Sequence, residues 1–204
     1  RGNSEQAKYN LDRAVEFAPQ MSEVHVAMAY YYQTVGDLAR TESAYNDAIA
    51  ASDASGDAKN NFGVFLCQQK KFARAETMFL EAIDTPKYTR TASSYENLGV
   101  CSKSDGKLAK AREYFMMALK YDPRRGNTLI GLTELDMEAS DYASARDTLA
   151  RYHQVANETA ESLALGIKIE QGLGDINAMK RFGITLIAKF PASPQAQEYR
   201  ANLH

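Results

Sequence analysis

The sequence predicts an all-α fold, a right-handed superhelical solenoid of stacked antiparallel helix pairs. Three observations predict it: an internal repeat, turn signals at the same period, and small residues wherever two helices would cross. The repeat is visible in "KNNFGVFLCQQKKFARAETMFLEAIDTPK" and "YENLGVCSKSDGKLAKAREYFMMALKYDP", which share a glycine, two alanines and a phenylalanine in register. Successive equivalents of one alanine are 34, 34, 36, 34 and 34 residues apart, a period typical of helical-repeat solenoids. These equivalents are Ala7, Thr41, Ala75, Ala111, Ala145 and Met179.

Each repeat is predicted to contain a helix A, a tight turn and a helix B. A turn signal precedes every equivalent position: "RGNSE", "VGDLA", "QKKFA", "SDGKL", "ASDYA" and "LGDIN". The helix that follows each signal should end at the next proline, aspartate or asparagine, since proline in particular lacks an N–H and its ring clashes with the preceding turn. The expected ends lie near Pro19, Asp53, Pro86, Pro123, Asn157 and Pro191.

These signals divide the chain into one domain, residues 1–204. We expect a half repeat without helix A at 1–21, full repeats at 22–55, 56–91, 92–125, 126–159 and 160–193, and a tail at 194–204 that forms a short helix. The missing helix A would come from an upstream segment, and without it the apolar surface of the half repeat is either frayed or covered by self-association. The repeat at 56–91 is two residues longer than its neighbours. Either a longer loop or an extended next helix takes up these residues.

Small residues should mark the crossing of helix A with helix B, because neither helix can bury its apolar stripe alone and a close crossing leaves no room for large side chains. Helix A supplies Ala29, Gly63, Gly99 and Thr133, and helix B supplies Ala7, Ala75, Ala111 and Ala145. One turn later, the core should be filled by Leu11, Tyr45, Phe79, Phe115 and Leu149. In the last repeat Met179 takes the crossing position and Gly183 replaces the aromatic residue.

Composition and motifs argue against several function classes. The net charge of −2 gives no basic excess for nucleic acid or an anionic membrane, and no apolar run approaches the ~18 residues of a membrane span. His25, His153 and His204 match no metal-ligand spacing, and His25 is expected in the core. Carboxylates are spread over helix faces, where solvation is the default. We therefore predict no enzyme activity and no catalytic, cofactor-binding or metal-binding residues.

The two cysteines, Cys67 and Cys101, lie on helices A of neighbouring repeats, at slightly different helix positions. The favoured interpretation is a pair of buried free thiols. A disulfide would require the two Cα atoms to lie within ~7 Å of each other.

Binding is the function that the predicted fold favours. Stacked A helices line the concave face of such a solenoid, and peptides commonly bind there. The residues predicted to bind protein on this groove are Tyr30, Asn60, Asn61, Val64, Cys67, Glu96, Asn97, Val100, Lys103, Ile130, Glu134 and Met137. The amides of Asn61 and Asn97 either bind a peptide backbone or tie adjacent helices together.

The repeat pattern resembles the tetratricopeptide repeat along nearly the whole chain. Chaperone-binding members of that class hold a carboxylate with a Lys/Asn pair, a second asparagine and a Lys/Arg pair. The corresponding positions here are Val26, Tyr30, Asn61, Ser93 and Asn97, of which only Asn61 matches. A carboxylate clamp, and with it a cytosolic co-chaperone, is therefore disfavoured.

A closer resemblance comes from "RGNSEQAK", "NNFGVFLCQQKKFARAETMFLEAI", "YENLGV", "AKAREYFMMAL" and "LALGIKIE". These strings are similar to the type IV pilus biogenesis/stability family of pilotins. The resemblance implies a lipoprotein on the periplasmic face of the outer membrane, anchored by an upstream lipidated segment, which helps pilus secretin subunits to localise and multimerise. The alternative is a generic bacterial adaptor in another envelope or cytosolic assembly.

Overall fold

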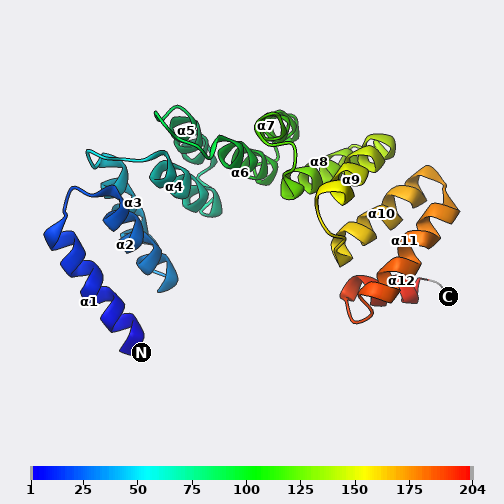
Figure 1. The fold of residues 1–204 in the computed structure, drawn as a ribbon, viewed down its shortest axis with the longest axis horizontal. Coiled ribbons are helices and arrows are strands. Elements are labelled where there is room, and N and C mark those ends of the chain that lie inside the picture. Colours follow the sequence, from blue (N-terminus) through cyan, green and yellow to red (C-terminus); the bar gives the residue numbers. More distant parts are fainter. Residues whose placement is uncertain (1, 203–204) are drawn as a thin grey trace. The chain divides into compact units, whose positions relative to one another are not determined.

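The structure, a computed structural model, describes residues 2–202, with side chains described from residue 4 onward. This part of the chain consists of helices joined by short connections, without a strand (Figure 1). The helices are α1 (Gly2–Phe17), α2 (Ser22–Thr34), α3 (Leu38–Ala50), α4 (Gly56–Gln68), α5 (Phe72–Ile83), α6 (Thr91–Ser104), α7 (Leu108–Tyr121), α8 (Gly126–Glu138), α9 (Tyr142–Val155), α10 (Ala160–Leu173), α11 (Ile176–Lys189) and α12 (Pro194–Ala201).

The predicted helix ends are confirmed. The odd-numbered helices from α1 to α11 each end a few residues before the expected stop, and α12 is the short helix predicted for the tail. The first turn signal is wrong, because α1 already begins at Gly2 and includes "NSE". Glu5 lies in the first turn of α1, where the positive end of the helix dipole stabilises a carboxylate.

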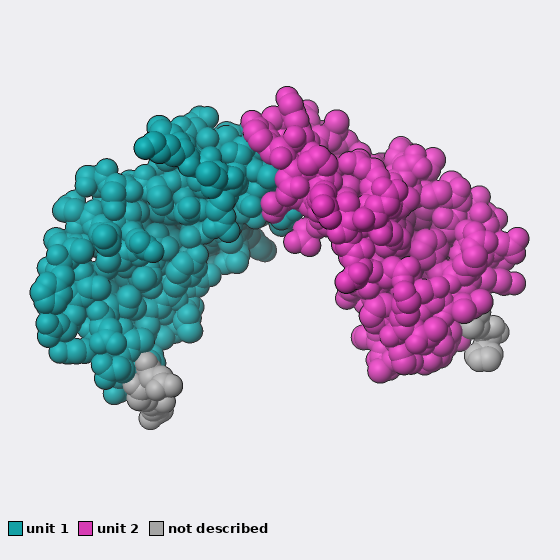
Figure 2. Space-filling model, in the orientation of Figure 1, with its two compact units in different colours: residues 1–106 teal, residues 107–204 magenta. Residues whose placement is uncertain are grey.

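The helices form two compact units, residues 1–106 with α1 to α6 and residues 107–204 with α7 to α12 (Figure 2). In the first unit α2 packs against α3 and α4 against α5, and α5 also packs against α6. In the second unit α8 pairs with α9 and α10 with α11, while α12 packs against both α10 and α11. Each unit is therefore a stack of helix pairs of the predicted kind.

The predicted crossing residues are buried. Ala29, Ala75, Ala111, Thr133 and Ala145 are each 0% exposed. The core-filling residues one turn later in helix B are also enclosed: Tyr45, Phe79, Phe115 and Leu149 are at most 3% exposed. Ala7 differs from its equivalents because it is exposed on α1.

Two glycines show how tight the packing is. A Cβ built at Gly63 on α4 would lie 2.7 Å from Cε1 of Phe79 on α5, and one at Gly131 on α8 would lie 2.7 Å from Cζ of Phe115 on α7. Both distances are shorter than van der Waals contact. Glycine at these positions therefore lets the buried rings approach the helix backbone.

The last repeat departs from the prediction. Ala178, which is 6% exposed, rather than Met179, takes the buried crossing position, and Phe182 supplies the aromatic ring. Gly183 replaces no aromatic. It makes room for Tyr199 of α12, whose Cζ would lie 2.1 Å from a Cβ at that position. Gly183 therefore faces α12, and the last pair crosses one residue out of register with the other repeats.

The two additional residues of the third repeat lie in a longer connection, residues 84–90, between α5 and α6. Tyr88 of this connection packs over the start of α4, where a Cβ at Gly56 would lie 2.4 Å from its ring. The Tyr88 hydroxyl also hydrogen-bonds that of Ser94 on α6, at 2.7 Å. The longer loop thus joins α4 to α6.

Two buried carboxylates correct the expectation that acidic residues are solvated. Asp136 on α8 and Glu170 on α10 have side chains only 3% and 5% exposed. Asp136 pairs with Arg112 of α7 at 2.6 Å, and Glu170 pairs with Arg146 of α9. Burial of an unpaired carboxylate is very costly, so each arginine supplies the required partner. The two pairs recur with the repeat and tie a helix B to the following helix A.

The Gly63 contact gives a first prediction. In a helix alanine is favoured over glycine by roughly 0.5–1 kcal/mol. At this position the overlap with Phe79 outweighs that gain, and we expect Gly63→Ala to lower the free energy of unfolding by about 1–2 kcal/mol, measured by urea denaturation.

Phe79→Leu provides the matched background, because it removes the ring that a Cβ at Gly63 would meet. There, Gly63→Ala should be neutral or stabilising. A Gly63→Ala variant more stable than the unsubstituted protein would contradict the close crossing.

Candidate functional site

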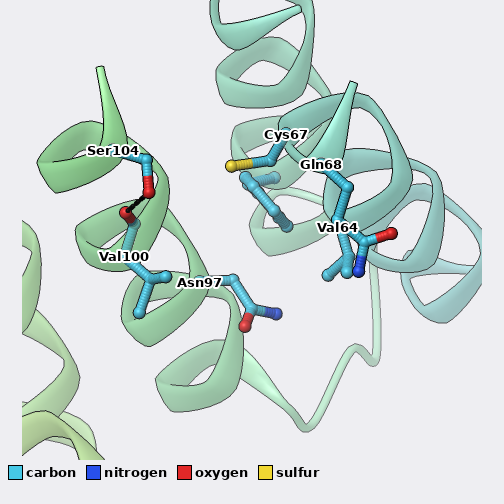
Figure 3. Close-up of a pocket in the computed structure, with 7 residues that line it drawn as sticks. Val64, Cys67, Gln68, Asn97, Val100 and Ser104 are labelled. Carbon is cyan, nitrogen blue, oxygen red and sulfur yellow. Dashed lines mark hydrogen bonds between the residues drawn. The ribbon is translucent and has the colours of Figure 1, made fainter. Parts of the chain in front are cut away.

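Four of the predicted groove residues line one pocket in the first unit. Val64 and Cys67 come from α4, and Asn97 and Val100 come from α6 (Figure 3). The pocket measures about 220 Å³, and the remaining residues that line it are Gln68, Phe79 and Ser104. Figure 3 shows the labelled side chains lying between the two helices.

The lining of this α4–α6 pocket is mainly apolar, and none of its lining residues carries a charge. Val100 is 52% exposed, whereas Phe79 is buried. The Ser104 hydroxyl donates to the Val100 carbonyl at 3.0 Å within the same helix (Figure 3). The volume is below the ~300–1,000 Å³ of most small-molecule sites, so the pocket suits one or two apolar side chains of a peptide.

The structure overturns the prediction of free thiols. Cys67 and Cys101 form a disulfide between α4 and α6, with their Cα atoms 5.8 Å apart. Within the repeat, Cys67 lies four residues after Gly63, whereas Cys101 lies only two residues after Gly99. Cys67 lies on the side of α4 that is turned toward α6, and Cys101 lies on the side of α6 that is turned toward α4. The different positions of the two cysteines in the repeat are therefore compatible with the bond.

A hydrogen-bond network provides a second connection between the same helices. The Asn60 carbonyl oxygen, Oδ1, accepts from the Ser94 hydroxyl at 2.9 Å and from the Asn97 amide at 3.1 Å. Tyr88 extends the network through Ser94, and burial raises the pKa of the Tyr88 hydroxyl. Of the two roles considered for Asn61 and Asn97, Asn97 has the second, because its amide joins α6 to Asn60 on α4.

Two of the predicted groove residues are not on an open surface. Asn60 is 6% exposed because the network encloses it, and Glu96 is 9% exposed within α6. The network lies near the first turns of α4 and α6, and the disulfide lies about two turns further along. The pocket between these two connections is therefore held open by a covalent bond at one end and hydrogen bonds at the other.

The other predicted groove residues of the first unit lie outside this pocket. Asn61 lines a different pocket, between α2 and α4. Tyr30 is 49% exposed, and its ring lies edge-on to that of Tyr45 at 6.3 Å. Lys103 is half-buried on α6.

In the second unit, the three predicted residues all lie on α8. Ile130 and Met137 are half-buried and pack against the core of the unit. Glu134 is also half-buried. These residues present less free apolar surface than Val100 does.

The two histidines among the described residues each contact a single oxygen atom. His25 is half-buried rather than in the core, because its Nε2 reaches the Pro19 carbonyl at 2.7 Å. His153 contacts the Ser162 hydroxyl at 3.2 Å, and burial lowers the pKa of its imidazole. His204 lies outside the described residues.

Two features are absent from the described part of the chain. Residues 2–202 contain no cluster of three or more side chains suited to hold a metal ion. Among the helices of this range, none has the length and apolar character needed to cross a bilayer.

The disulfide gives a second prediction. It closes a loop across a sequence separation of 34 residues, and such a bond stabilises a protein by about 2–4 kcal/mol. We expect dithiothreitol to lower the melting temperature of the protein. The Cys67→Ala/Cys101→Ala variant should melt at the lower temperature with or without the reductant. Two titratable thiols in the unreduced protein would contradict the bond.

Comparisons with known proteins agree with the repeat pattern and with the pilus resemblance. Models of the tetratricopeptide repeat match residues 56–85 and 92–125. The type IV pilus assembly protein PilF of Pseudomonas aeruginosa is 31% identical over 201 residues, which cover 98% of this chain and 80% of that protein.

Two solved structures share the fold along almost all of the chain. One comes from a functional characterization of Pseudomonas aeruginosa PilF and has a TM-score of 0.82 at 31% identity, covering 99% of this chain and 91% of that one. The other, described as PilW, a widely conserved type IV pilus biogenesis factor, has a TM-score of 0.83 at 25% identity, covering 97% of this chain and 90% of that one. The identity with PilF and the shared fold together show that this chain belongs to the PilF family of tetratricopeptide-repeat type IV pilus biogenesis proteins.

Proposed function

We propose that this protein is a pilotin-like scaffold that binds pilus secretin subunits through the α4–α6 pocket and assists their localisation and multimerisation. Membership of the PilF family supports a role in pilus assembly. The observation that carries the choice of site is an apolar, uncharged pocket with an exposed valine on the A-helix side of the repeat. A surface of this kind suits an apolar peptide segment better than it suits a metabolite.

In the proposed mechanism, the protein acts by holding a secretin segment in a preformed pocket. The disulfide and the Asn60 network fix α4 and α6 at both ends of the pocket before any partner arrives. A preformed site loses less conformational entropy on binding than a flexible one, so more of the contact energy appears as affinity. The bound secretin segment would place its apolar side chains between Val64 and Val100.

The disulfide also supports the proposed location. Disulfides persist in oxidising compartments such as the bacterial periplasm and are rare in the cytosol. We infer that the protein acts at the periplasmic face of the outer membrane. There, a lipid anchor on a segment outside residues 1–204 would hold the bound secretin subunit at the membrane.

The test places charge in the pocket. We expect Val64→Asp/Val100→Asp to weaken binding of purified pilus secretin fragments by at least about tenfold, because an unpaired carboxylate is costly to desolvate against an apolar segment. Affinity would be measured by calorimetry, and circular dichroism would verify that the helix content is unchanged. Leu80→Asp is the matched control, because Leu80 is 38% exposed on α5 in the same unit and does not line the pocket.

The outcomes separate the alternatives. Loss of binding in the pocket variant alone supports the proposal. Undiminished affinity in the folded pocket variant would exclude this site. If the unsubstituted protein bound no secretin fragment, the generic adaptor would be the better interpretation.

A further inference from the structure

The first unit contains a second pocket, between the N-terminal ends of α2 and α4, that differs in character from the α4–α6 pocket. It measures about 400 Å³, and its lining includes Ser22, Glu23, Asp53, Asp57 and Asn61. We refer to it as the acidic pocket, because the only charged residues that line it are these three carboxylates.

A buried hydroxyl group without a partner lies in the wall of this pocket. Ser22 lines the pocket and is 3% exposed, and its Oγ makes no hydrogen bond within the described residues. Most buried polar side-chain atoms in proteins are hydrogen-bonded, and leaving one unsatisfied costs about 1–3 kcal/mol. The Ser22 hydroxyl, in the wall of the pocket, therefore has both its donor and its acceptor capacity unused.

The charge of the pocket identifies the class of ligand. Asp53 accepts the backbone N–H of Ser22 at 2.8 Å, and Asp57 pairs with Arg90 at 3.2 Å. Glu23 is exposed in the first turn of α2, and its carboxylate makes no ion pair within residues 2–202. The two helix N-termini contribute roughly +0.5 each. Together with Arg90 they offset two of the three carboxylates, and a net negative charge remains.

We propose that the acidic pocket binds a basic side chain, lysine or arginine, of a peptide segment in a protein partner. The cationic group would pair with Glu23 and donate a hydrogen bond to the Ser22 hydroxyl. Of the five positions that correspond to the carboxylate clamp, only Val26 and Asn61 line this pocket. This inference goes beyond the proposed function, because it holds whichever protein supplies the segment.

A peptide suits the site better than a free cation does. Asn61 offers an amide that can pair with a peptide backbone through both a donor and an acceptor. On the same helix, Val64 lies one turn away and lines the α4–α6 pocket. A segment that leaves the acidic pocket along α4 therefore meets the apolar pocket next.

The test uses a defined probe, the blocked pentapeptide Ala-Ala-Arg-Ala-Ala, titrated into isotopically labelled full chain and followed by NMR. We expect saturable shifts of the Ser22 and Ala58 backbone amides and of the Asn61 side-chain amide. The same peptide with citrulline in place of arginine keeps the shape without the charge and should produce no saturable shift. Raising the salt concentration from about 50 mM to about 500 mM should weaken binding of the arginine peptide.

Two variants test the named contacts. Glu23→Gln should weaken binding of the arginine peptide about two- to fivefold. Glu161→Gln is the matched control, because Glu161 is likewise the second residue of its helix and exposed, on α10 of the other unit. Ser22→Ala should weaken binding without lowering the melting temperature, because the hydroxyl has no internal partner to lose.

Several results would overturn the proposal. One is equal binding of the arginine and citrulline peptides. Another is a Glu23→Gln variant that keeps a native spectrum and full affinity. Binding of free butylguanidinium as tightly as the pentapeptide would overturn the assignment to a peptide segment.

Discussion

The constraint on which this structure depends is that no helix of the repeat can bury its apolar stripe alone. Helix pairs must approach closely, and the approach is possible only where a small residue faces a large ring, as Gly63 faces Phe79. This contact fixes Phe79 of α5 against α4. Its buried ring forms one wall of the α4–α6 pocket. The same packing rule that forms the core therefore also forms the site.

Two different kinds of pocket lie on the same helix, α4. Near its start, carboxylates surround a buried hydroxyl group, and one turn further an apolar pocket is held between a hydrogen-bond network and a disulfide. Apolar burial supplies affinity without direction, whereas a charge pair adds specificity and register. A partner segment with a basic residue beside apolar ones would satisfy both pockets, and this combination distinguishes the chain from a carboxylate-binding repeat protein.

Much of the fold could be predicted from the sequence, because periodic small residues and helix stops are local signals. The failures arose where a tertiary contact overrides the repeat. Gly183 accommodates Tyr199 of α12 in place of an aromatic residue of its own, and the offset of Cys67 from Cys101 conceals their proximity. Asn60 and Glu96 are buried although their helix positions predict a place on the groove, because position along a helix does not reveal burial by the next helix. No sequence motif marks the acidic pocket, because residues from α2, a loop and α4 come together there only in the folded chain.

The central claim is that the α4–α6 pocket holds a secretin segment, and photo-crosslinking tests it most directly. A benzoylphenylalanine would replace Val100, which is 52% exposed in the pocket, and in a parallel sample Leu80, which lies on α5 outside it. After irradiation with purified pilus secretin fragments, mass spectrometry would identify the joined peptides. We expect one secretin segment, rich in apolar residues, attached at position 100 and absent at position 80. Crosslinking at position 80 alone, or none at position 100 while the two proteins co-elute, would contradict it.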